Sequence, residues 1–208
     1  MHFDGTDGSI SLPDSSGLGK VATIIGNPQI STAQSKFGGA SLYVNGDATS
    51  VANYVMIDGG AELSFEGDFT LDWWQYPVVF PDSYGGIFNV AWEQSGAVGL
   101  SWNSSGGQYH VNPGYPSSSF SAPAVQEWHH VAISRSGTFY RTFVDGAQVY
   151  EATSFTGTWG GAPACIGAGG PPGDNGDFNG YVDELRIVKG AAMWTVDFTP
   201  PTAPYPDP

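Results

Sequence analysis

The sequence contains one cysteine, Cys165, and only six lysine and arginine residues among 208. A single cysteine excludes an internal disulfide, so we expect the chain to fold in a reducing cytosol. Six basic residues against twenty acidic ones give a formal net charge of −14. Nucleic acids and anionic membrane surfaces attract basic segments, so the charge argues against both kinds of partner.

Long apolar runs and leucine are also scarce. No run approaches the roughly 20 residues that span a bilayer, and the opening Met1–Gly5 leads directly into the domain, which predicts that no signal peptide is present. Seven leucines against sixteen valines favour strands over helices. The 30 glycines and 15 prolines follow no three-residue period, which excludes collagen and is typical of turn-rich β structure.

Residues 128–149 predict three consecutive antiparallel strands. Ser136–Gly137 is expected to join the first two, and Asp145–Gly146 the second and third. An Asp-Gly pair suits a type I′ hairpin because both turn residues need positive φ. Residues 69–76 predict another strand, with Phe69, Leu71 and Trp73 on one face. About a dozen such strands, with turn signals every 8–12 residues, indicate a β-sandwich of one domain.

The last nine residues contain five prolines. A proline-rich segment lacks ladder donors, so residues 199–208 are expected to lie extended over the surface or to reach a partner. Deleting them should then leave the isolated domain folded.

Five sequence blocks, in order, resemble the laminin G-like, concanavalin A-like lectin/glucanase jelly roll. They are Phe3–Gly5; Lys36–Ser41 with Tyr54–Ile57; Phe69–Trp74; Trp128–Ala132 with Val144–Gly146; and Asn179–Ile187. Phe198–Pro201 resembles a tail found in the versions carried by bacteriophage virion proteins. The resemblance implies an all-β, antiparallel jelly-roll β-sandwich over residues 1–208, with the proline-rich tail at about 199–208.

The chain lacks the carboxylate pattern of a glycosidase with this fold. Such an enzyme places two or three carboxylates on one strand face, as in E-x-D-x-E. Asp72 has no acidic mate at position 70 or 74, and Glu184 faces Val182 and Arg186, the second of which should form an ion pair with it. The adjacent pair His129–His130 has no nucleophile at a recognisable spacing. The sequence therefore predicts no catalytic residues and no enzyme activity.

Asp183 is the main candidate for a metal site. Strand alternation places it on one face with Tyr181, Leu185 and Ile187, where a lone carboxylate must be paired or metal-bound. The resemblance implies that Asp183 and Asp4 can together hold a structural Ca²⁺, with carbonyls and waters supplying the remaining oxygens. The alternative is an Asp183 bonded to backbone amides or to a histidine.

Flat aromatic side chains in or beside loops are candidates for stacking on sugar rings, although packing explains each of them equally well. These residues are Tyr84, Trp102, Tyr109, Tyr115 and Trp159.

The resemblance and the missing signal predict a non-enzymatic virion surface protein of a bacteriophage, either a head decoration or a tail-associated module with glycan adhesion. It would be made in the host cytoplasm and carried on the virion surface. Its partners would be other virion proteins or further copies of itself, and host-surface glycans, without nucleic acid or membrane insertion. The alternative is an extracellular carbohydrate-binding module of a bacterial surface protein or of a polysaccharide-active enzyme.

Overall fold

The computed structural model describes residues 1–46, 53–80, 85–90, 98–103, 107–112, 119–168 and 178–208. This part of the chain forms strands and one short 3-10 helix, and none of its helices has the length and hydropathy needed to cross a bilayer. The elements in chain order are β1 (Ala22–Ile25), β2 (Gln29–Ser31), β3 (Ser41–Asn45), β4 (Tyr54–Ile57), η1 (Ala61–Leu63), β5 (Ser64–Phe65), β6 (Phe69–Val79), β7 (Gly85–Val90), β8 (Val98–Asn103), β9 (Gln108–Asn112), β10 (Ser119–Ser121), β11 (His129–Ser136), β12 (Phe139–Val144), β13 (Ala147–Ala152), β14 (Trp159–Gly160), β15 (Ala164–Ile166) and β16 (Asn179–Lys189).

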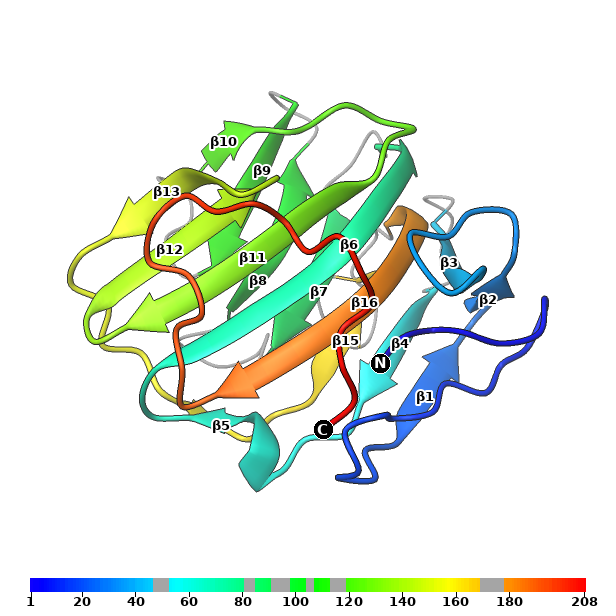
Figure 1. Ribbon diagram of the computed structural model, residues 1–208, viewed down its shortest axis with the longest axis horizontal. Helices are drawn as coiled ribbons and strands as arrows, with labels where there is room; N and C mark the ends of the chain where they lie inside the picture. Colours follow the sequence, from blue (N-terminus) through cyan, green and yellow to red (C-terminus); the bar gives the residue numbers. More distant parts are fainter. Residues whose placement is uncertain (47–52, 81–84, 91–97, 104–106, 113–118, 169–177) are drawn as a thin grey trace.

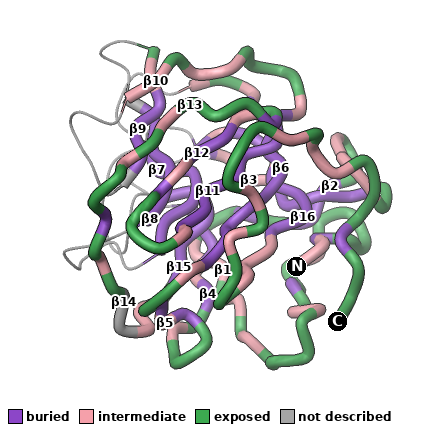
Figure 2. Tube along the Cα trace, turned by 60° about the vertical axis from the view of Figure 1, so that its left-hand side comes forward, coloured by how far each residue is buried: buried purple, intermediate pink, exposed green. Residues whose placement is uncertain are grey.

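Two seven-stranded antiparallel sheets make up the sandwich (Figure 1). The first sheet has the order β1-β4-β15-β7-β8-β9-β10, and the second has the order β13-β12-β11-β6-β16-β3-β2. Strands β14 and β5 form a separate small pair. Figure 2 shows that buried residues gather in the strands, while the connections are mostly exposed. The predicted all-β sandwich is confirmed.

Strand β6 shows why this sequence builds a core. Its odd-numbered residues Phe69, Leu71 and Trp73 are fully buried and point between the sheets, as their alternation predicts. The Trp73 ring packs on Phe88 of the first sheet, with 5.2 Å between ring centroids. Its even-numbered residues, such as Trp74, therefore lie on the outer face of the second sheet.

The two hairpins around β12 agree with the sequence in one case and differ by one residue in the other. Asp145 and Gly146 have φ values of 50° and 82°, which confirms a turn with two positive-φ residues. At the other end, Ser136 pairs with Phe139, so the connecting residues are 137–138 instead of 136–137. The register places the glycine first because Gly137 supplies the positive φ that the turn needs.

Phe3–Gly5, the first block that resembles the family, does not form a regular strand. Phe3 has a φ of 59°, which interrupts an extended conformation. Instead, Met1 alone pairs with β16: its ammonium donates to the Leu185 carbonyl at 2.8 Å, and the Leu185 amide donates to the Met1 carbonyl at 3.0 Å. The two chain ends therefore lie close together beside β16 (Figure 1).

Residues 191–208, which we call the tail, cross the outer face of the second sheet over β11, β6 and β16 (Figure 1). Ser134 donates to the Trp194 carbonyl at 2.6 Å, and the Phe198 amide donates to the Gly146 carbonyl at 2.9 Å. The stacked rings of Trp194 and Phe198, 4.1 Å apart, cover His130. The expectation of a segment lying over the surface is confirmed, and the surface belongs to the chain itself rather than to a partner.

Candidate functional site

Four half-buried aromatic rings form a row across the outer face of the second sheet, beyond the part that the tail covers. Tyr181 of β16 lies opposite Tyr43 of β3 and Tyr76 of β6, with ring centroids 4.8 and 5.9 Å apart. Trp128, directly before β11, extends the row and lies 5.6 Å from Tyr76. We call these four residues the aromatic row. Cross-strand pairing holds the three tyrosines on one face, because direct partners in a sheet share a side.

Amide side chains border the aromatic row on the same face. Gln29 of β2 is exposed opposite Tyr43, and Asn45 pairs across the strands with Asn179, two positions along from Tyr43 and Tyr181. The Tyr43 hydroxyl donates to Asn45 Oδ1 at 3.3 Å. Phenols and amides both donate and accept hydrogen bonds. The face thus combines apolar ring surface with groups that can bind hydroxyls.

The phenol of Tyr181 stays neutral over the physiological pH range. Burial raises its pKa, and the neighbouring Tyr43 and Tyr76 add to this, while a hydrogen bond with Ser31 acts in the opposite direction. A neutral phenol keeps its O–H as a donor. Tyr181 therefore adds no charge to the aromatic row.

Tyr205 of the tail and three residues beneath it form a polar cluster, which we call the clamp: Asp72, His130, Arg186 and Tyr205. Asp72 is fully buried and receives two bonds from Arg186, Nε to Oδ1 at 3.0 Å and Nη2 to Oδ2 at 2.9 Å. The Tyr205 hydroxyl donates to Asp72 Oδ2, and His130 Nε2 lies 3.1 Å from the same hydroxyl. The guanidinium of Arg186 packs 3.9 Å from the centre of the Tyr205 ring. A buried carboxylate needs this degree of pairing.

The expected ion pair between Glu184 and Arg186 is therefore wrong, and a β-bulge explains why. Glu184 has a φ of 52°, and the register with β6 shifts between Asp183 and Arg186. The extra residue turns Leu185 and Ile187 toward the sandwich interior while Asp183 stays on the outer face. The buried Glu184 carboxylate instead accepts from His2 Nδ1 at 2.7 Å and from the Tyr205 amide at 2.7 Å.

The histidine pair and Asp72 contribute to packing in this structure. His129 Nδ1 lies 2.7 Å from Asp145 Oδ2, and the His130 amide donates to Asp145 Oδ1 at 2.9 Å, which fixes the β12–β13 turn. The His130 ring is fully buried under the tail. These side chains are arranged to hold the tail and the turn, and they lie away from open surface.

The two aspartates predicted as metal ligands both reach the same turn, residues 36–38. Asp183 Oδ2 accepts from the Lys36 and Phe37 amides at 2.8 and 3.1 Å, and its Oδ1 accepts from the Glu184 amide at 2.9 Å. Asp4 lies against Gly38, where a Cβ would overlap its carboxylate. With N–H groups directed at both oxygens, Asp183 does not fit a calcium site, and no group of three metal-ligating side chains occurs among the described residues. The alternative in which Asp183 binds backbone amides is the one observed.

A pH-dependent stability is expected from Asp183. Burial is the largest effect on its pKa and outweighs the lowering by the Phe37 and Lys36 amides, so the pKa is about 7, against about 3.9 in an unfolded chain. The folded state binds the proton more tightly, so this contribution to stability is complete below about pH 4 and is lost as the pH rises to about 7, by up to about 1.4 kcal/mol per pH unit. Denaturant unfolding of the wild type and of Asp183→Asn between pH 4.5 and 7.5 measures it. Parallel pH profiles for the two proteins would contradict the prediction.

Of the five aromatic residues predicted from the sequence as sugar platforms, the two whose side chains the structure describes are covered. Tyr109 is fully buried and accepts from Gln75 Nε2 at 2.8 Å, and Trp102 is 8% exposed and stacked on Phe80 at 3.9 Å. Tyr84, Tyr115 and the side chain of Trp159 lie outside the described residues. Tyr109 and Trp102 belong to the core because β9 and β8 turn those positions inward, and a covered ring cannot stack on a sugar.

Comparison with known proteins gives the family and the fold. The sequence profile of the concanavalin A-like lectin/glucanases superfamily matches residues 49–194. No curated protein sequence matches the chain. Among solved structures, domain 4 of AbnA, a GH43 extracellular arabinanase from Geobacillus stearothermophilus in complex with arabinotriose, has a TM-score of 0.60 at 18% identity. The match covers 92% of this chain and 91% of that one.

Two larger proteins contain a similar sandwich. Trypanosoma rangeli sialidase in complex with sialic acid matches 87% of this chain with a TM-score of 0.64 at 16% identity. The botulinum neurotoxin serotype D binding domain matches 93% with a TM-score of 0.62 at 12% identity. The chain spans 30% of the sialidase and 47% of the neurotoxin domain. At these identities the similarity shows a shared lectin-like fold.

Proposed function

This chain belongs to the concanavalin A-like lectin/glucanases superfamily, and from that premise we propose that it is a non-enzymatic glycan-binding domain whose sugar-binding surface is the aromatic row. The observation that carries the proposal is the set of four half-buried rings on adjacent strands, bordered by the amides of Gln29, Asn45 and Asn179. The apolar C–H faces of a sugar ring pack on aromatic rings. Its hydroxyls would bind the neighbouring amides and phenols.

The relatives support a glycan ligand. One similar structure is an arabinanase domain in complex with arabinotriose, and another is a sialidase in complex with sialic acid. The charge of this chain narrows the choice for its own ligand, because a net charge of −14 repels polyanionic chains. A neutral glycan is therefore the ligand that we propose.

The absence of enzyme activity is part of the proposal. Asp72, Glu184 and His130 are each buried, and each is bonded to the tail or to the N-terminal residues. Hydrolysis of a glycosidic bond needs two carboxylates that flank the substrate. None of the four residues of the aromatic row is acidic, so this surface is suited to holding a sugar rather than to cleaving one.

Glycan binding should weaken when rings of the aromatic row are removed. We expect Trp128→Ala and Tyr76→Ala each to lower the affinity for a neutral oligosaccharide by about 3- to 10-fold, because an aromatic contact contributes about 0.5–1.5 kcal/mol. A glycan array followed by isothermal titration calorimetry with the best neutral ligand measures this. Phe139→Ala is the matched control, because Phe139 is also an exposed aromatic residue but lies at the β11–β12 turn.

Two results would contradict the proposal. One is an array that shows no neutral glycan bound. The other is a ligand whose affinity is lost in Phe139→Ala and kept in Trp128→Ala and Tyr76→Ala. Turnover of a bound glycan would contradict the non-enzymatic part alone.

The assignment to a bacteriophage virion, as a head decoration or tail-associated module, stays a prediction. It depends on the missing signal peptide and on the resemblance of Phe198–Pro201 to a C-terminal segment of the versions carried by bacteriophage virion proteins. In this structure Phe198 packs on the chain's own sheet. Mass spectrometry of purified virions tests it. Stoichiometric copies in the particle would support the virion, while a protein recovered only free or attached to a bacterial surface would support the carbohydrate-binding module.

A further inference from the structure

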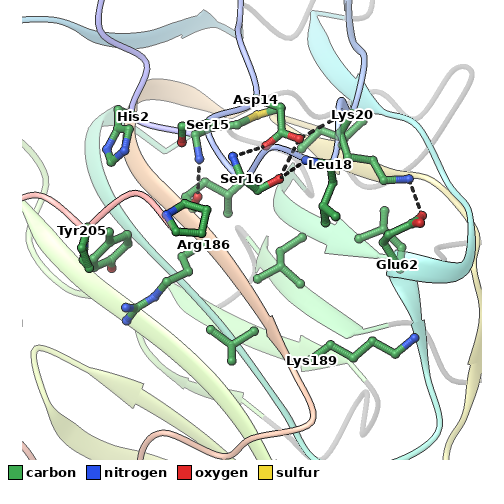
Figure 3. Close-up of a pocket in the computed structure, with 18 of the residues that line it drawn as sticks. His2, Asp14, Ser15, Ser16, Leu18, Lys20, Glu62, Arg186, Lys189 and Tyr205 are labelled. Carbon is green, nitrogen blue, oxygen red and sulfur yellow. Dashed lines mark hydrogen bonds and ion pairs between the residues drawn. The ribbon is translucent and has the colours of Figure 1, made fainter.

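A groove of about 670 Å³ opens beside the C-terminal half of β16, at the opposite end of this strand from the aromatic row (Figure 3). Leu63, Leu185 and Ile187 give it an apolar wall, and Lys20 and Lys189 lie along its rim (Figure 3). Ligand sites in proteins commonly have this size and a mainly apolar lining. The groove therefore has the dimensions of a binding site.

The wall of this groove is an open sheet edge. Strand β16 pairs with β3 only through residues 179–182, while on its other side it pairs with β6 as far as Lys189. On the side of β6, the Gly190 amide donates to the Asp68 carbonyl. On the opposite side, the amide and the carbonyl of Leu185 both form hydrogen bonds with Met1. Since backbone groups alternate along a strand, the N–H and C=O of residues 187 and 189 point into the groove. No described strand pairs with them there.

Met1 already shows how this edge accepts a chain. Its ammonium and carbonyl form a reciprocal pair with Leu185, which is the arrangement of two residues opposite one another in an antiparallel ladder. The next such positions along the edge are residues 187 and 189. A second extended segment that lies beyond Met1 would continue the same ladder.

Both basic and acidic side chains line this groove, and the acidic ones are Asp14 and Glu62. Of the six lysine and arginine residues in the chain, Lys20, Arg186 and Lys189 line this groove. Lys20 forms an ion pair with Glu62 at 2.9 Å. Lys189 Nζ donates to the Ala61 carbonyl at 2.6 Å, and it forms no ion pair with a carboxylate among the described residues. An acidic ligand could therefore supply a carboxylate partner for the Lys189 ammonium.

We propose that this groove binds an extended peptide segment of a partner protein, which adds a strand to β16 at residues 187 and 189. Its side chains would alternate, apolar ones against Leu63 and Ile187 and acidic ones toward Lys20 and Lys189. An alkyl ligand fits less well, because it would leave the backbone groups of residues 187 and 189 without hydrogen bonds. Strand addition satisfies them and uses alternate side chains for specificity.

The test uses a fluorescently labelled, acetylated hexapeptide of alternating valine and glutamate, with binding followed by anisotropy. We expect it to bind at least about 10-fold more tightly than the same peptide with lysine in place of glutamate. A third peptide carries N-methyl groups on alternate amides, which block pairing with a strand edge but keep the side chains. Its affinity should fall about 3- to 10-fold for each hydrogen bond to residues 187 and 189 that an N-methyl group blocks.

Two protein variants locate the binding. Ile187→Pro removes the N–H that faces the groove and leaves the bonds to β6 in place, as proline is tolerated on the free side of an edge strand. This variant should lower the affinity for the Val-Glu peptide, and Ile187→Val is its control. Lys189→Glu should also lower the affinity for this peptide, whereas Arg141→Glu on β12 should leave it unchanged.

The proposal would be overturned if the Val-Lys peptide, or the N-methylated peptide, bound as tightly as the Val-Glu peptide. If Ile187→Pro fails to fold, the three peptides on the wild-type protein still decide the question. Trp128→Ala should bind the Val-Glu peptide normally, so failure of the glycan proposal and failure of this one can be told apart.

Discussion

Replacing Arg186 by methionine should lower the free energy of unfolding by about 3–5 kcal/mol, because it leaves the carboxylate of Asp72 buried without its charged partner. Asp72 is fully buried, and both of its oxygens accept a bond from this one guanidinium. Methionine keeps a similar length of apolar side chain, so the loss measures the charge rather than the packing. Equilibrium unfolding in urea or guanidinium, followed by tryptophan fluorescence, gives the value.

Two further variants test whether the loss of stability comes from the unpaired charge of Asp72. Adding Asp72→Asn to Arg186→Met removes the unpaired charge and should recover part of the lost stability, since the two sites are in direct contact and are therefore coupled. Arg141→Met removes an ion pair with Glu151, whose carboxylate is partly exposed and can be solvated once the arginine is gone, so it should cost less, about 1 kcal/mol or below. Equal losses for Arg186→Met and Arg141→Met would show that Asp72 does not depend on Arg186.

Removing residues 199–208 should also destabilise the domain strongly, by about 2–6 kcal/mol. The truncation takes away the Tyr205 hydroxyl that binds Asp72 and the Tyr205 amide that binds Glu184, and each of these two lost hydrogen bonds costs about 1–3 kcal/mol. The sequence alone predicts that the domain stays folded after this deletion. The contacts of Tyr205 add the expectation of a large loss of stability, because these residues cover part of the sheet's outer face.

Tyr205→Phe serves as the control for the truncation. It keeps the ring beneath Arg186 and the amide bond to Glu184, and it should lose only about 1–3 kcal/mol. Melting temperature and amide hydrogen exchange on β11 and β6 follow both changes. A truncated protein with the melting temperature and exchange protection of the full chain would show that the tail rests on the sheet without stabilising it.

The sequence predicts which side chains of a regular strand point inward. It does not predict how that alternation continues past a β-bulge. Phe69, Leu71 and Trp73 point into the core as their spacing predicts, and Asp145–Gly146 forms the expected turn. The bulge at Glu184 reverses the pattern within β16, so that Asp183 and Leu185 lie on different faces. No local signal marks a non-glycine residue that will adopt a positive φ, because the strain is offset by contacts with His2 and Tyr205, which are remote in sequence.

The aromatic row escaped sequence analysis for a related reason. Tyr43, Tyr76, Trp128 and Tyr181 come from four separate segments, and each of them looks like an ordinary strand residue. Only the register between strands brings them side by side, and register is set by the whole sheet. Trp102 and Tyr109 lie beside loops, yet proximity to a loop does not determine which side of a strand a ring occupies.

The contact of His2 with both Glu184 and Asp207 has a mechanical consequence. It places the first and last residues of the chain at one point on the surface, held by bonds of 2.7 and 3.0 Å. A force that pulls the two ends apart would load this contact first, then the Met1–Leu185 pair and the Tyr205–Asp72 bond, before it reached a strand of either sheet. The contacts between the chain ends should therefore break before any strand separates. Under tension the domain should release its two ends while both sheets remain intact.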